Sequence, residues 1–500
     1  MTGNEPAAKR SNSILLRRTA WDDYGFGTSF EVYALDEKDQ MVFLGTTKIA
    51  KRGMVSKGLF EPTVYTVLPS EFRRLSTDFF SVGQTPEFYE AVIKRYGAEG
   101  GPALLRELQD LALRPEDIDD SLNEEAVRIS LFRTVSVGAV RGQFRRIALG
   151  GKTTEGFSFG YHIVSPSGHH SDNIRMVVRP EGRLSTNVHV VIGPNGSGKT
   201  TMLRNIRKAV VHRDHDRPGE LGVDLSELSV FTGLVNVSFS AFDAEFATDL
   251  DEKQQPYLRF TDIGLNPPEV LSRSASGELE SRVPTQQERF ATLVKGCLEA
   301  RRDLLVESMK EICKSDLVLE SLGIDQVDRM AEMDFESLSS GHKIVLLTLM
   351  SLILYCEEKT LVLMDEPESH LHPPLLSSFT RVVASLMGER NGIAIIATHS
   401  PVILQEVPTG CAWRFWRSGD VGKVDPVTVP TFGENLGVLT REIFGLEIER
   451  SGFHKVLLEV AEKTGDFETA LSLLGNDIGI EAKSILRSMV RRSRQGDVKR

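Results

Sequence analysis

The sequence has 500 residues, of which 40% are hydrophobic and 26% are charged. This size and composition predict a globular protein with about three structural units and exclude a largely disordered chain. The formal net charge of −11 excludes a uniformly basic nucleic-acid coat protein, because a field of this sign repels phosphate except at local patches.

Neither the cysteines nor the apolar segments indicate a secreted or membrane protein. The four cysteines are far apart, so neither a zinc ribbon nor a disulfide framework can be read from them. Residues 1–18 contain an apolar run too short for a secretory signal. The most apolar segment, Ile344–Cys356, is shorter than the roughly 20 residues that a bilayer span needs. We therefore expect a buried helix there, and a cytoplasmic protein with no membrane partner.

The first 129 residues are predicted to form an N-terminal α+β domain. Ser29–Leu35 and Met41–Leu44 alternate in the manner of strands, with a charged turn between them. The hydrophobic period changes at Pro86, where a helix-like stretch begins, and a second one follows over Pro102–Leu113. From about residue 130, short β-rich runs are expected to lead into an apolar strand, Val188–Ile192.

A phosphate-binding loop follows this strand. Gly193–Thr200 matches G-x-x-x-x-G-K-[ST], whose glycines let consecutive backbone N–H groups face one anion at the N-terminus of a helix. In such a loop Lys199 can bridge the β- and γ-phosphates of ATP, and the hydroxyl of Thr200 can bind Mg²⁺. The residues predicted to bind nucleotide are Gly193, Pro194, Asn195, Gly196, Ser197, Gly198, Lys199, Thr200 and Thr201.

A helical lobe is predicted downstream, over about residues 265–335. Its clearest signal begins near Pro284, where Thr285 and Glu288 have the spacing of a capping box. Apolar residues from there to Ile312 fall on one helical face. The region is too short for a long coiled-coil arm, because a helix rises only about 1.5 Å per residue.

Two further apolar strands end in side chains suited to phosphate chemistry. A buried parallel strand over Thr360–Asp365 would deliver its terminal acids beside the phosphate loop. Asp365 is predicted to hold Mg²⁺, and Glu366 to take a proton from the attacking water. A strand over Gly392–Ala397 precedes His399, which can hydrogen-bond a γ-phosphate oxygen. Taken alone, these strand ends are also compatible with a solvated acidic turn and an ordinary histidine.

The order of four motifs resembles that of ABC-type ATPases of the RecF/SMC/OLD branch. The motifs are Gly193–Thr200, Leu338–Lys343, Asp365–Glu368 and Ala397–Pro401. The resemblance covers about residues 130–450 and implies an α/β fold, in which an ABC-type P-loop ATPase head with a helical lobe follows the N-terminal α+β domain. Residues 451–500 are then expected to form a C-terminal helical segment with a basic tail. In that family two heads sandwich two ATP molecules, so Ser339 and Gly341 would contact the γ-phosphate bound to the partner chain.

Some positions depart from the family's pattern. The strand after the phosphate-binding helix is followed by no glutamine, so Ser240 or Asp243 would have to make the metal contact found there in the family. His370 and His372 are spaced so that they could instead indicate a metal site, yet no third ligand is visible in the sequence. An inter-subunit loop is therefore favoured at these histidines.

Short segments near both ends narrow the resemblance to bacterial anti-phage defence ATPases of the Septu (PtuA-like) and retron-associated kinds. These segments are Trp21–Phe26, Gly45–Ile49, Thr431–Asn435 and Arg441–Gly445. In those systems an ATPase head pairs with a separately encoded nuclease. The resemblance implies a Mg²⁺-dependent ATPase that forms a homodimer, or a higher homo-oligomer, through ATP-sandwiched heads and regulates a separate effector such as a nuclease.

Two other functions stay open. A RecF/SMC-like repair ATPase acting directly on DNA would bind nucleic acid through local basic groups. Candidate groups are Lys51-Arg52, Arg73-Arg74, Arg145-Arg146, Arg301-Arg302, Arg487, Arg491, Arg492 and Arg494. A transporter ATPase subunit is disfavoured by the long N-terminal region and by the missing glutamine.

Overall fold

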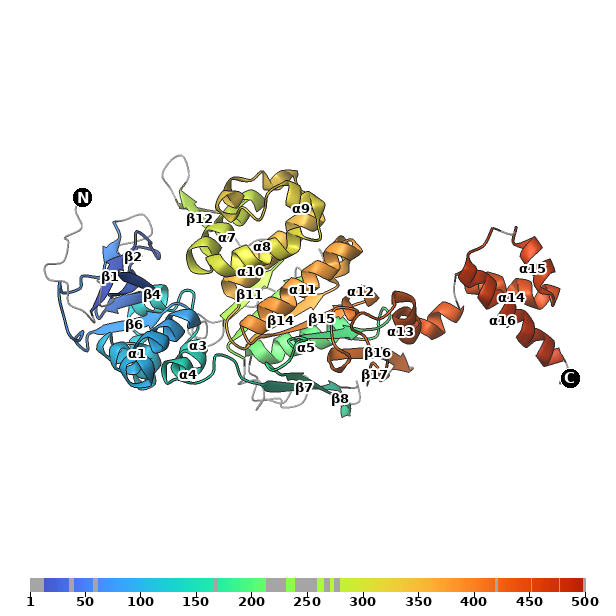
Figure 1. The fold of residues 1–500 in the computed structure, drawn as a ribbon, viewed down its shortest axis with the longest axis horizontal. Coiled ribbons are helices and arrows are strands. Elements are labelled where there is room, and N and C mark those ends of the chain that lie inside the picture. Colours follow the sequence, from blue (N-terminus) through green and yellow to red (C-terminus); the bar gives the residue numbers. More distant parts are fainter. Residues whose placement is uncertain are drawn as a thin grey trace.

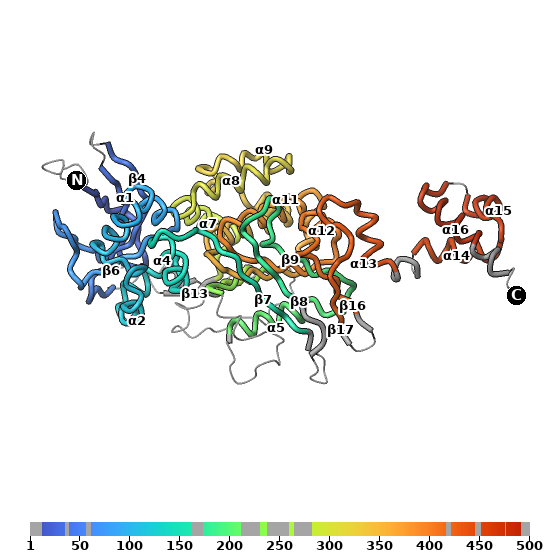
Figure 2. The backbone as a smooth tube through the Cα atoms, turned by 60° about the horizontal axis from the view of Figure 1, so that its bottom comes forward, coloured from blue at the N-terminus to red at the C-terminus, as the bar shows by residue number. Residues whose placement is uncertain are grey.

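The computed structural model describes most of the chain. The described residues are 13–35, 40–56, 62–164, 170–212, 231–238, 259–264, 270–273, 279–418, 421–450, 452–475 and 477–497. They form an elongated molecule with the N-terminal region at one end and the last helices at the other (Figures 1 and 2).

The N-terminal region is built on an antiparallel sheet with strand order β1-β3-β4-β6. Its strands are β1 (Ile14–Arg18), β2 (Phe26–Gly27), β3 (Ser29–Leu35), β4 (Met41–Lys51), β5 (Val64–Tyr65) and β6 (Phe79–Gly83). The structure therefore confirms the strands predicted at 29–35 and 41–44. Helix α1 (Pro86–Glu107) contacts β4 and contains a break at Gly97, whose φ is +75°. The second helix-like stretch, expected over Pro102–Leu113, is continuous with α1 only to Glu107, and a separate short helix covers Leu111–Leu113.

Short helices extend this region beyond residue 129. They are η1 (Leu111–Leu113), η2 (Pro115–Asp117), α2 (Ile118–Ser121), η3 (Val127–Leu131), α3 (Val137–Ala139), η4 (Val140–Phe144) and α4 (Arg145–Ala148). Val140 and Phe144 lie in the same buried core as Phe26 and Phe80. The expected β-rich runs from residue 130 are thus wrong up to Ala148, because these β-branched and aromatic side chains complete a helical layer over the N-terminal sheet.

A seven-stranded sheet forms the centre of the molecule, with strand order β11-β10-β14-β15-β9-β16-β17. Its strands are β9 (Val188–Ile192), β10 (Gly233–Ser238), β11 (Arg259–Ile263), β14 (Thr360–Asp365), β15 (Ile393–Thr398), β16 (Ala412–Ser418) and β17 (Val421–Pro426). All pairs are parallel except β16 with β17. Two hairpins accompany the sheet: β7 (Phe157–Val164) with β8 (His170–Val178), and β12 (Val270–Arg273) with β13 (Leu279–Arg282).

Helices cover both faces of this sheet, because alternate residues of each strand point to opposite sides. In β9, Val190 and Ile192 enter a core shared with Leu349, whereas Val191 enters another shared with Met202. Figure 1 shows α10 and α11 on one side and α5 on the other. The helices of the head are α5 (Lys199–His212), α7 (Gln286–Ala300), α8 (Arg302–Cys313), α9 (Leu317–Ser321), η5 (Val327–Glu332), η6 (Phe335–Ser337), α10 (Ser340–Tyr355), η7 (Pro367–His370), α11 (Pro373–Glu389), α12 (Pro401–Leu404) and η8 (Thr409–Cys411). The fold is therefore α/β, with helices on both faces of a mainly parallel sheet and a helical lobe beside it.

The helical lobe starts later than the predicted residue 265. Residues 270–273 and 279–282 pair as the β12–β13 hairpin, and helix begins at Gln286. The predicted capping box is confirmed: Thr285 Oγ1 accepts the N–H of Glu288 at 3.1 Å, and the Glu288 carboxylate accepts the N–H of Thr285 at 3.0 Å. These two bonds satisfy backbone donors that a helix start leaves without partners.

The C-terminal region is helical over its described residues. It contains α13 (Leu436–Arg450), α14 (Phe453–Thr464), α15 (Phe467–Leu473) and α16 (Ile480–Asp497). The last three pack around a small core of their own that includes Leu457, Ala470 and Leu486. They lie beyond α13, away from the central sheet (Figure 1). Among the described residues, no helix combines the length and apolarity needed to cross a bilayer.

Buried acids join the N-terminal region to the central sheet. Glu357 and Glu358 lie in the turn before β14 and are 6% and 2% exposed. The backbone N–H of Ser136 donates to both carboxylate oxygens of Glu357, at 2.9 and 3.0 Å. Arg146 forms an ion pair with Glu358 at 2.5 Å. The N-terminal region is thus attached at the amino end of β14, opposite the end where the strand leads into its terminal acids.

Candidate active site

The phosphate loop lies between β9 and α5, at the carboxyl ends of the parallel strands. Gly193 has no room for a side chain, since a Cβ there would lie 2.0 Å from the carbonyl oxygen of Phe415. Gly196 and Gly198 have φ of +74° and +106°, a conformation that other residues rarely adopt. The hydroxyl of Ser197 is buried with no hydrogen-bond partner among the described residues. A loop of this shape, with a buried hydroxyl able to make a further bond, fits a phosphate group.

Lys199 is the first residue of α5 and turns back over the loop. Its Nζ donates to the carbonyl oxygens of Gly193 at 2.9 Å and Pro194 at 3.1 Å, and lies 3.0 Å from Nε2 of His399. Burial lowers the pKa of Lys199, and the carboxylates nearby, Glu366 foremost, act in the opposite direction. No ion pair joins its ammonium to a carboxylate within the described ranges. A buried ammonium held by neutral acceptors is suited to receive an anion.

The acids at the end of β14 face the same place. Asp365 is in register with Ser238 of β10 and with Ala397 of β15. The next residue, Glu366, has φ of +46° and donates its N–H to the carbonyl oxygen of Ala397 at 2.9 Å. This left-handed conformation costs a residue with a side chain about 1 kcal/mol. It directs the carboxylate toward His399, whose Nε2 lies 3.0 Å from Oε1 of Glu366.

His399 follows β15, the strand between those that carry the phosphate loop and the acids. Its Nε2 is 3.0 Å from Nζ of Lys199 and 3.0 Å from Oε1 of Glu366. A neutral ring nitrogen either accepts or donates, so Nε2 can serve the ammonium or the carboxylate but not both at once. If Lys199 bonds to another anion, Nε2 is left to donate to Glu366.

Glu368 is a site residue to which the sequence reasoning assigned no role. One of its carboxylate oxygens accepts the hydroxyl of Thr398 at 2.7 Å and the backbone N–H of His399 at 2.5 Å. It thereby fixes the backbone that presents the histidine. The available signal was the Asp-Glu-Pro-Glu run at 365–368, whose proline starts the short helix η7 and returns the second glutamate toward β15.

The signature segment starts α10. Ser339 is the N-cap of this helix, and its Oγ accepts the N–H of His342 at 3.3 Å. Ser339 is exposed, and its described hydrogen bonds are with His342, none with the phosphate loop. Gly341 is buried, and a Cβ there would lie 2.4 Å from the carbonyl oxygen of His370. The glycine therefore permits the close approach of the signature helix to the loop that follows the acids.

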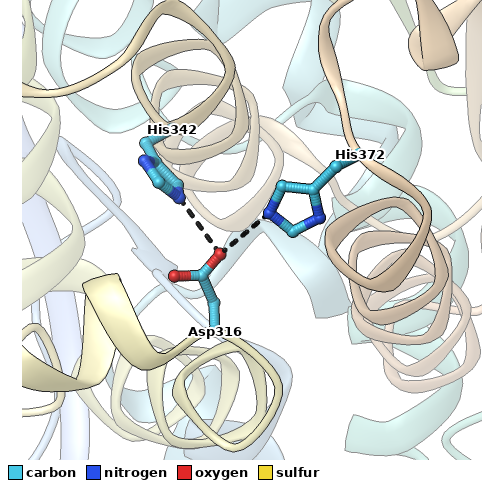
Figure 3. Close-up of side chains that lie close together, drawn as sticks. All are labelled: Asp316, His342 and His372. Carbon is cyan, nitrogen blue, oxygen red and sulfur yellow. Dashed lines mark hydrogen bonds and ion pairs between the residues drawn. The ribbon is translucent and has the colours of Figure 1, made fainter.

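A second polar cluster consists of Asp316, His342 and His372 (Figure 3), and His342 also contacts Ser339. Nε2 of His342 is 3.0 Å from Oδ2 of Asp316, and Nε2 of His372 is 3.6 Å from the same oxygen. These ligand-type atoms all lie within 4.8 Å of one another. The sequence paired His372 with His370, whereas the structure places it beside Asp316 and His342. Such contacts between distant segments left no signal in the sequence.

The structure thus brings one group of predicted residues together and leaves another apart. Lys199, Glu366 and His399 meet at the end of the sheet, next to Asp365. Thr200 and Thr201 are exposed in the first turn of α5. Ser339 and Gly341 belong to the start of the separate helix α10, away from the phosphate loop. The predicted substitutes for the missing glutamine, at 240 and 243, lie outside the described residues.

Three comparisons relate the chain to known proteins. The chain is 34% identical to Protein ea59 of Escherichia phage lambda over 531 aligned residues, covering 99% of this chain and 98% of that protein. Residues 225–405 match a family described as "AAA domain, putative AbiEii toxin, Type IV TA system". Among solved structures, the SMC head domain of Thermotoga maritima aligns with 54% of this chain and 98% of its own at 13% identity, with a TM-score of 0.27. The UvrA2 protein of Deinococcus radiodurans aligns with 58% of this chain and 40% of its own at 16% identity, with a TM-score of 0.29. Scores this low carry no conclusion about function.

Proposed function

This chain belongs to the family of the phage lambda protein ea59, and from that premise we propose that it is a Mg²⁺-dependent ATPase whose heads pair around ATP. The observation that supports the proposal best is the convergence of three groups at the carboxyl end of the sheet. Nζ of Lys199, Nε2 of His399 and Oε1 of Glu366 follow one another at 3.0 Å intervals. They stand beside a loop with the backbone shape of a phosphate cradle.

Each group has a distinct task in hydrolysis. The loop amides and Lys199 bind the β- and γ-phosphates. Glu366 takes a proton from water as the water oxygen bonds to the γ-phosphorus and the bond to the β-phosphate oxygen breaks, giving ADP and phosphate. His399 orients Glu366 through Nε2, which is released from Lys199 when the lysine binds phosphate. Thr200 and Asp365 would hold Mg²⁺, which supplies charge neutralisation at the phosphates when bound.

The signature helix completes the site of a second copy. Ser339 and Gly341 are at the N-terminus of α10, where the helix dipole and the first N–H groups favour an anion. Ser339 is exposed in this chain, so its hydroxyl is available to the γ-phosphate held by another copy. We therefore propose a homodimer, or a higher homo-oligomer, in which each chain closes the other's pocket.

Closure of the heads is proposed to regulate a separate effector, such as a nuclease, in anti-phage defence in the cytoplasm. The matched family is described in terms of a toxin of a type IV system, and the relative is a phage protein; both facts are compatible with a role in conflict between phage and host. A plating assay tests this part. The chain and the genes flanking it, with wild-type sequence or Glu366→Gln, would be compared for phage yield, and equal yields would refute the defence role.

The ATPase proposal is tested by measuring phosphate release over a range of protein concentrations. Turnover per chain should rise with concentration to a plateau, because two heads are needed for one site. Glu366→Gln should lower turnover by about a hundredfold or more while ATP still binds and dimers accumulate. His454→Ala, in α14, removes an imidazole far from the site and serves as the matched control. Unchanged turnover in Glu366→Gln would refute the assigned base, and turnover independent of concentration would refute paired heads.

Direct action on DNA is the second candidate, and one observation favours it. Arg73, Arg74 and Arg106 line a hollow of about 430 Å³ on the N-terminal region. Arg52 and Arg146 of the predicted basic pairs form ion pairs with carboxylates of the same chain, Arg52 at the surface and Arg146 with the buried Glu358. Salt-dependent binding of a labelled duplex by the isolated protein, weakened by Arg73→Gln with Arg74→Gln, would support this candidate. No binding at low salt would dismiss it.

A further inference from the structure

A chain of polar contacts runs from the exposed signature serine into the helical lobe. Oγ of Ser339 lies 2.9 Å from Nδ1 of His342, and Nε2 of the same ring lies 3.0 Å from Oδ2 of Asp316. The serine and the histidine are on the first turn of α10, and the aspartate is the N-cap of α9. His342 is 8% exposed and Asp316 is 4% exposed, so the ring is held between a surface hydroxyl and a buried carboxylate.

The aspartate is itself firmly placed. Its other oxygen, Oδ1, accepts the backbone N–H groups of Val318 and Leu319, both at 3.0 Å. Burial acts to raise the pKa of Asp316, but these hydrogen bonds and His342 lower it below its usual value. The carboxylate is therefore charged and oriented, with Oδ2 left to accept the N–H on Nε2 of His342.

Hydrogen-bond donors, and not a metal ion, account best for this cluster. His372 accepts the backbone N–H of Leu375 on Nδ1 at 3.2 Å, so a neutral ring carries its proton on Nε2, the atom that faces Asp316. A metal ligand needs a lone pair on that nitrogen. In Figure 3, Nε2 of both imidazoles faces the same carboxylate oxygen, at 3.0 Å for His342 and 3.6 Å for His372.

The orientation of the Ser339 hydroxyl follows from the state of His342. When Nε2 donates to Asp316, Nδ1 of a neutral ring accepts the serine O–H, and the serine then offers only lone pairs to an approaching phosphate. When Nδ1 carries a proton, it donates to Oγ, and the serine O–H is free to point outward. A phosphate oxygen beside Ser339 can only accept a hydrogen bond, so its approach selects the second arrangement, in which the serine O–H points outward.

We propose that His342 is a positioning residue for Ser339: supported by Asp316, it donates from Nδ1 to the serine Oγ, so that the serine O–H donates to the γ-phosphate held by the partner chain. This inference rests on the proposed pairing of heads around ATP. It assigns a role to a histidine and an aspartate that lie outside the nucleotide pocket of their own chain.

A double-mutant cycle in the full-length protein tests the inference. Ser339→Ala should lower kcat by about a hundredfold, as expected for a lost donor to a developing oxyanion. His342→Met, which keeps bulk but cannot donate, should lower kcat by roughly tenfold with a smaller change in KM, because ATP is bound by the other chain's loop. His342→Gln should retain most of the activity, since its amide can donate to Oγ. In the Ser339→Ala background, His342→Met should cause no further loss.

A structural role for His342 would give a different result. Loss of packing would lower the melting temperature and would add to the effect of Ser339→Ala, so additive losses, or failure of His342→Gln to restore activity, would overturn the inference. Full activity of His342→Met would overturn it as well, and if Ser339→Ala is impaired in the same assay, the paired-head function still stands. Full activity of Ser339→Ala would instead refute the paired heads. Stoichiometric zinc in the purified protein, lost in His342→Met, would show that Asp316, His342 and His372 form a metal site and that His342 does not position Ser339.

Discussion

Two lysines are almost equally buried in this chain, and their surroundings differ. Lys48 in β4 is 4% exposed and Lys199 at the phosphate loop is 5% exposed. Nζ of Lys48 forms an ion pair with Oδ2 of Asp23 at 2.7 Å and donates to the carbonyl oxygen of Ser130 at 3.0 Å. Lys199 contacts two carbonyl oxygens and one imidazole. One buried ammonium is paired directly with a carboxylate, and the other contacts carbonyl oxygens and an imidazole.

We interpret Lys48 as a charge that stabilises the fold and Lys199 as a charge positioned to bind a ligand. Burial alone would raise the pKa of Asp23, but Lys48, Ser130 and Arg133 bring it below its usual value. The Lys48–Asp23 pair is therefore charged, and each charge has its partner within the fold. Burial lowers the pKa of Lys199, and the carboxylates of Glu366, Asp365 and Glu368 offset this only in part, without a direct ion pair among the residues that the structure describes. A buried charge without a direct ion pair is costly, and a binding site for an anion is one place where such a charge is useful.

The largest expected effect is on hydrolysis, and Lys199→Met measures it. Removing the ammonium should lower turnover by about a hundredfold to a thousandfold, because it neutralises the transferring phosphate. The free energy of unfolding should stay the same or rise, since a poorly solvated charge is removed. Phosphate release and denaturant unfolding report the two quantities. If Lys199→Met hydrolyses ATP normally, or unfolds more easily than the wild-type protein, Lys199 has a structural role like that of Lys48.

The reverse pattern is expected for Lys48→Met. Breaking one side of a buried ion pair leaves Asp23 with only part of its neutralisation, and such changes cost about 3 to 5 kcal/mol. Arg133, 2.7 Å from the other oxygen of Asp23, should keep the loss near the lower end. Denaturant unfolding measures it, and turnover of the folded fraction should be unaffected. A loss smaller than that of an exposed pair would mean that the network contributes little.

The sequence predicted that Lys199, Glu366 and His399 lie near one another, and the structure places them together because most of their segments are local. The phosphate loop is continuous in sequence, and the acids and His399 each follow an apolar strand, so parallel pairing alone brings their ends together. The Lys48 network is not local: Lys48 and Ser130 are 82 positions apart, and Ser130 and Asp23 are 107 apart. Trp21–Phe26 and Gly45–Ile49 were noticed only as family-like segments, and their meeting at this ion pair required the fold.

Other features that the sequence did not predict also depend on contacts between distant segments. The helices between Val137 and Ala148 are three to five residues long and contain β-branched and aromatic residues, so propensity favoured strands until tertiary packing decided otherwise. The contacts of Asp316 with His342 and His372 join three helix starts whose order in sequence gives no sign of proximity. Periodicity and loop motifs predict elements and strand ends, but not which side chains of separate elements meet.

Asp110 shows that a buried group without a counter-charge is not always a site. It is 1% exposed, it accepts the hydroxyl of Tyr89 at 3.1 Å, and burial raises its pKa from 3.8 to about 7. The folded protein keeps this proton up to about pH 7, whereas the unfolded chain loses it near 3.8, so the stabilisation is complete below 3.8 and is lost as pH rises through 7.

Asp110→Asn should therefore flatten the pH dependence of stability. Between pH 5 and pH 8 the wild-type protein should lose about 2 to 3 kcal/mol from this group, and the variant should not, while hydrolysis is unchanged. Unfolding midpoints at several pH values provide the measurement. Parallel curves for the two proteins would show that the carboxyl is ionised in the fold and, like Asp23, compensated.

The smallest effect on stability is expected from Glu357→Gln, at the contact between the N-terminal region and β14. The variant leaves one amide oxygen to accept the N–H of Ser136. The carboxylate now accepts that N–H on both oxygens, and loss of the charge should cost about 1 kcal/mol. Hydrolysis by the heads should persist, because this contact is at the amino end of β14 and Glu366 follows its carboxyl end. Turnover that falls several-fold without a matching loss of stability would contradict this. Such a result would mean that a change in the N-terminal region alters the nucleotide site through β14. The ion-pair network of Lys48 and the ATP site could then no longer be treated as independent.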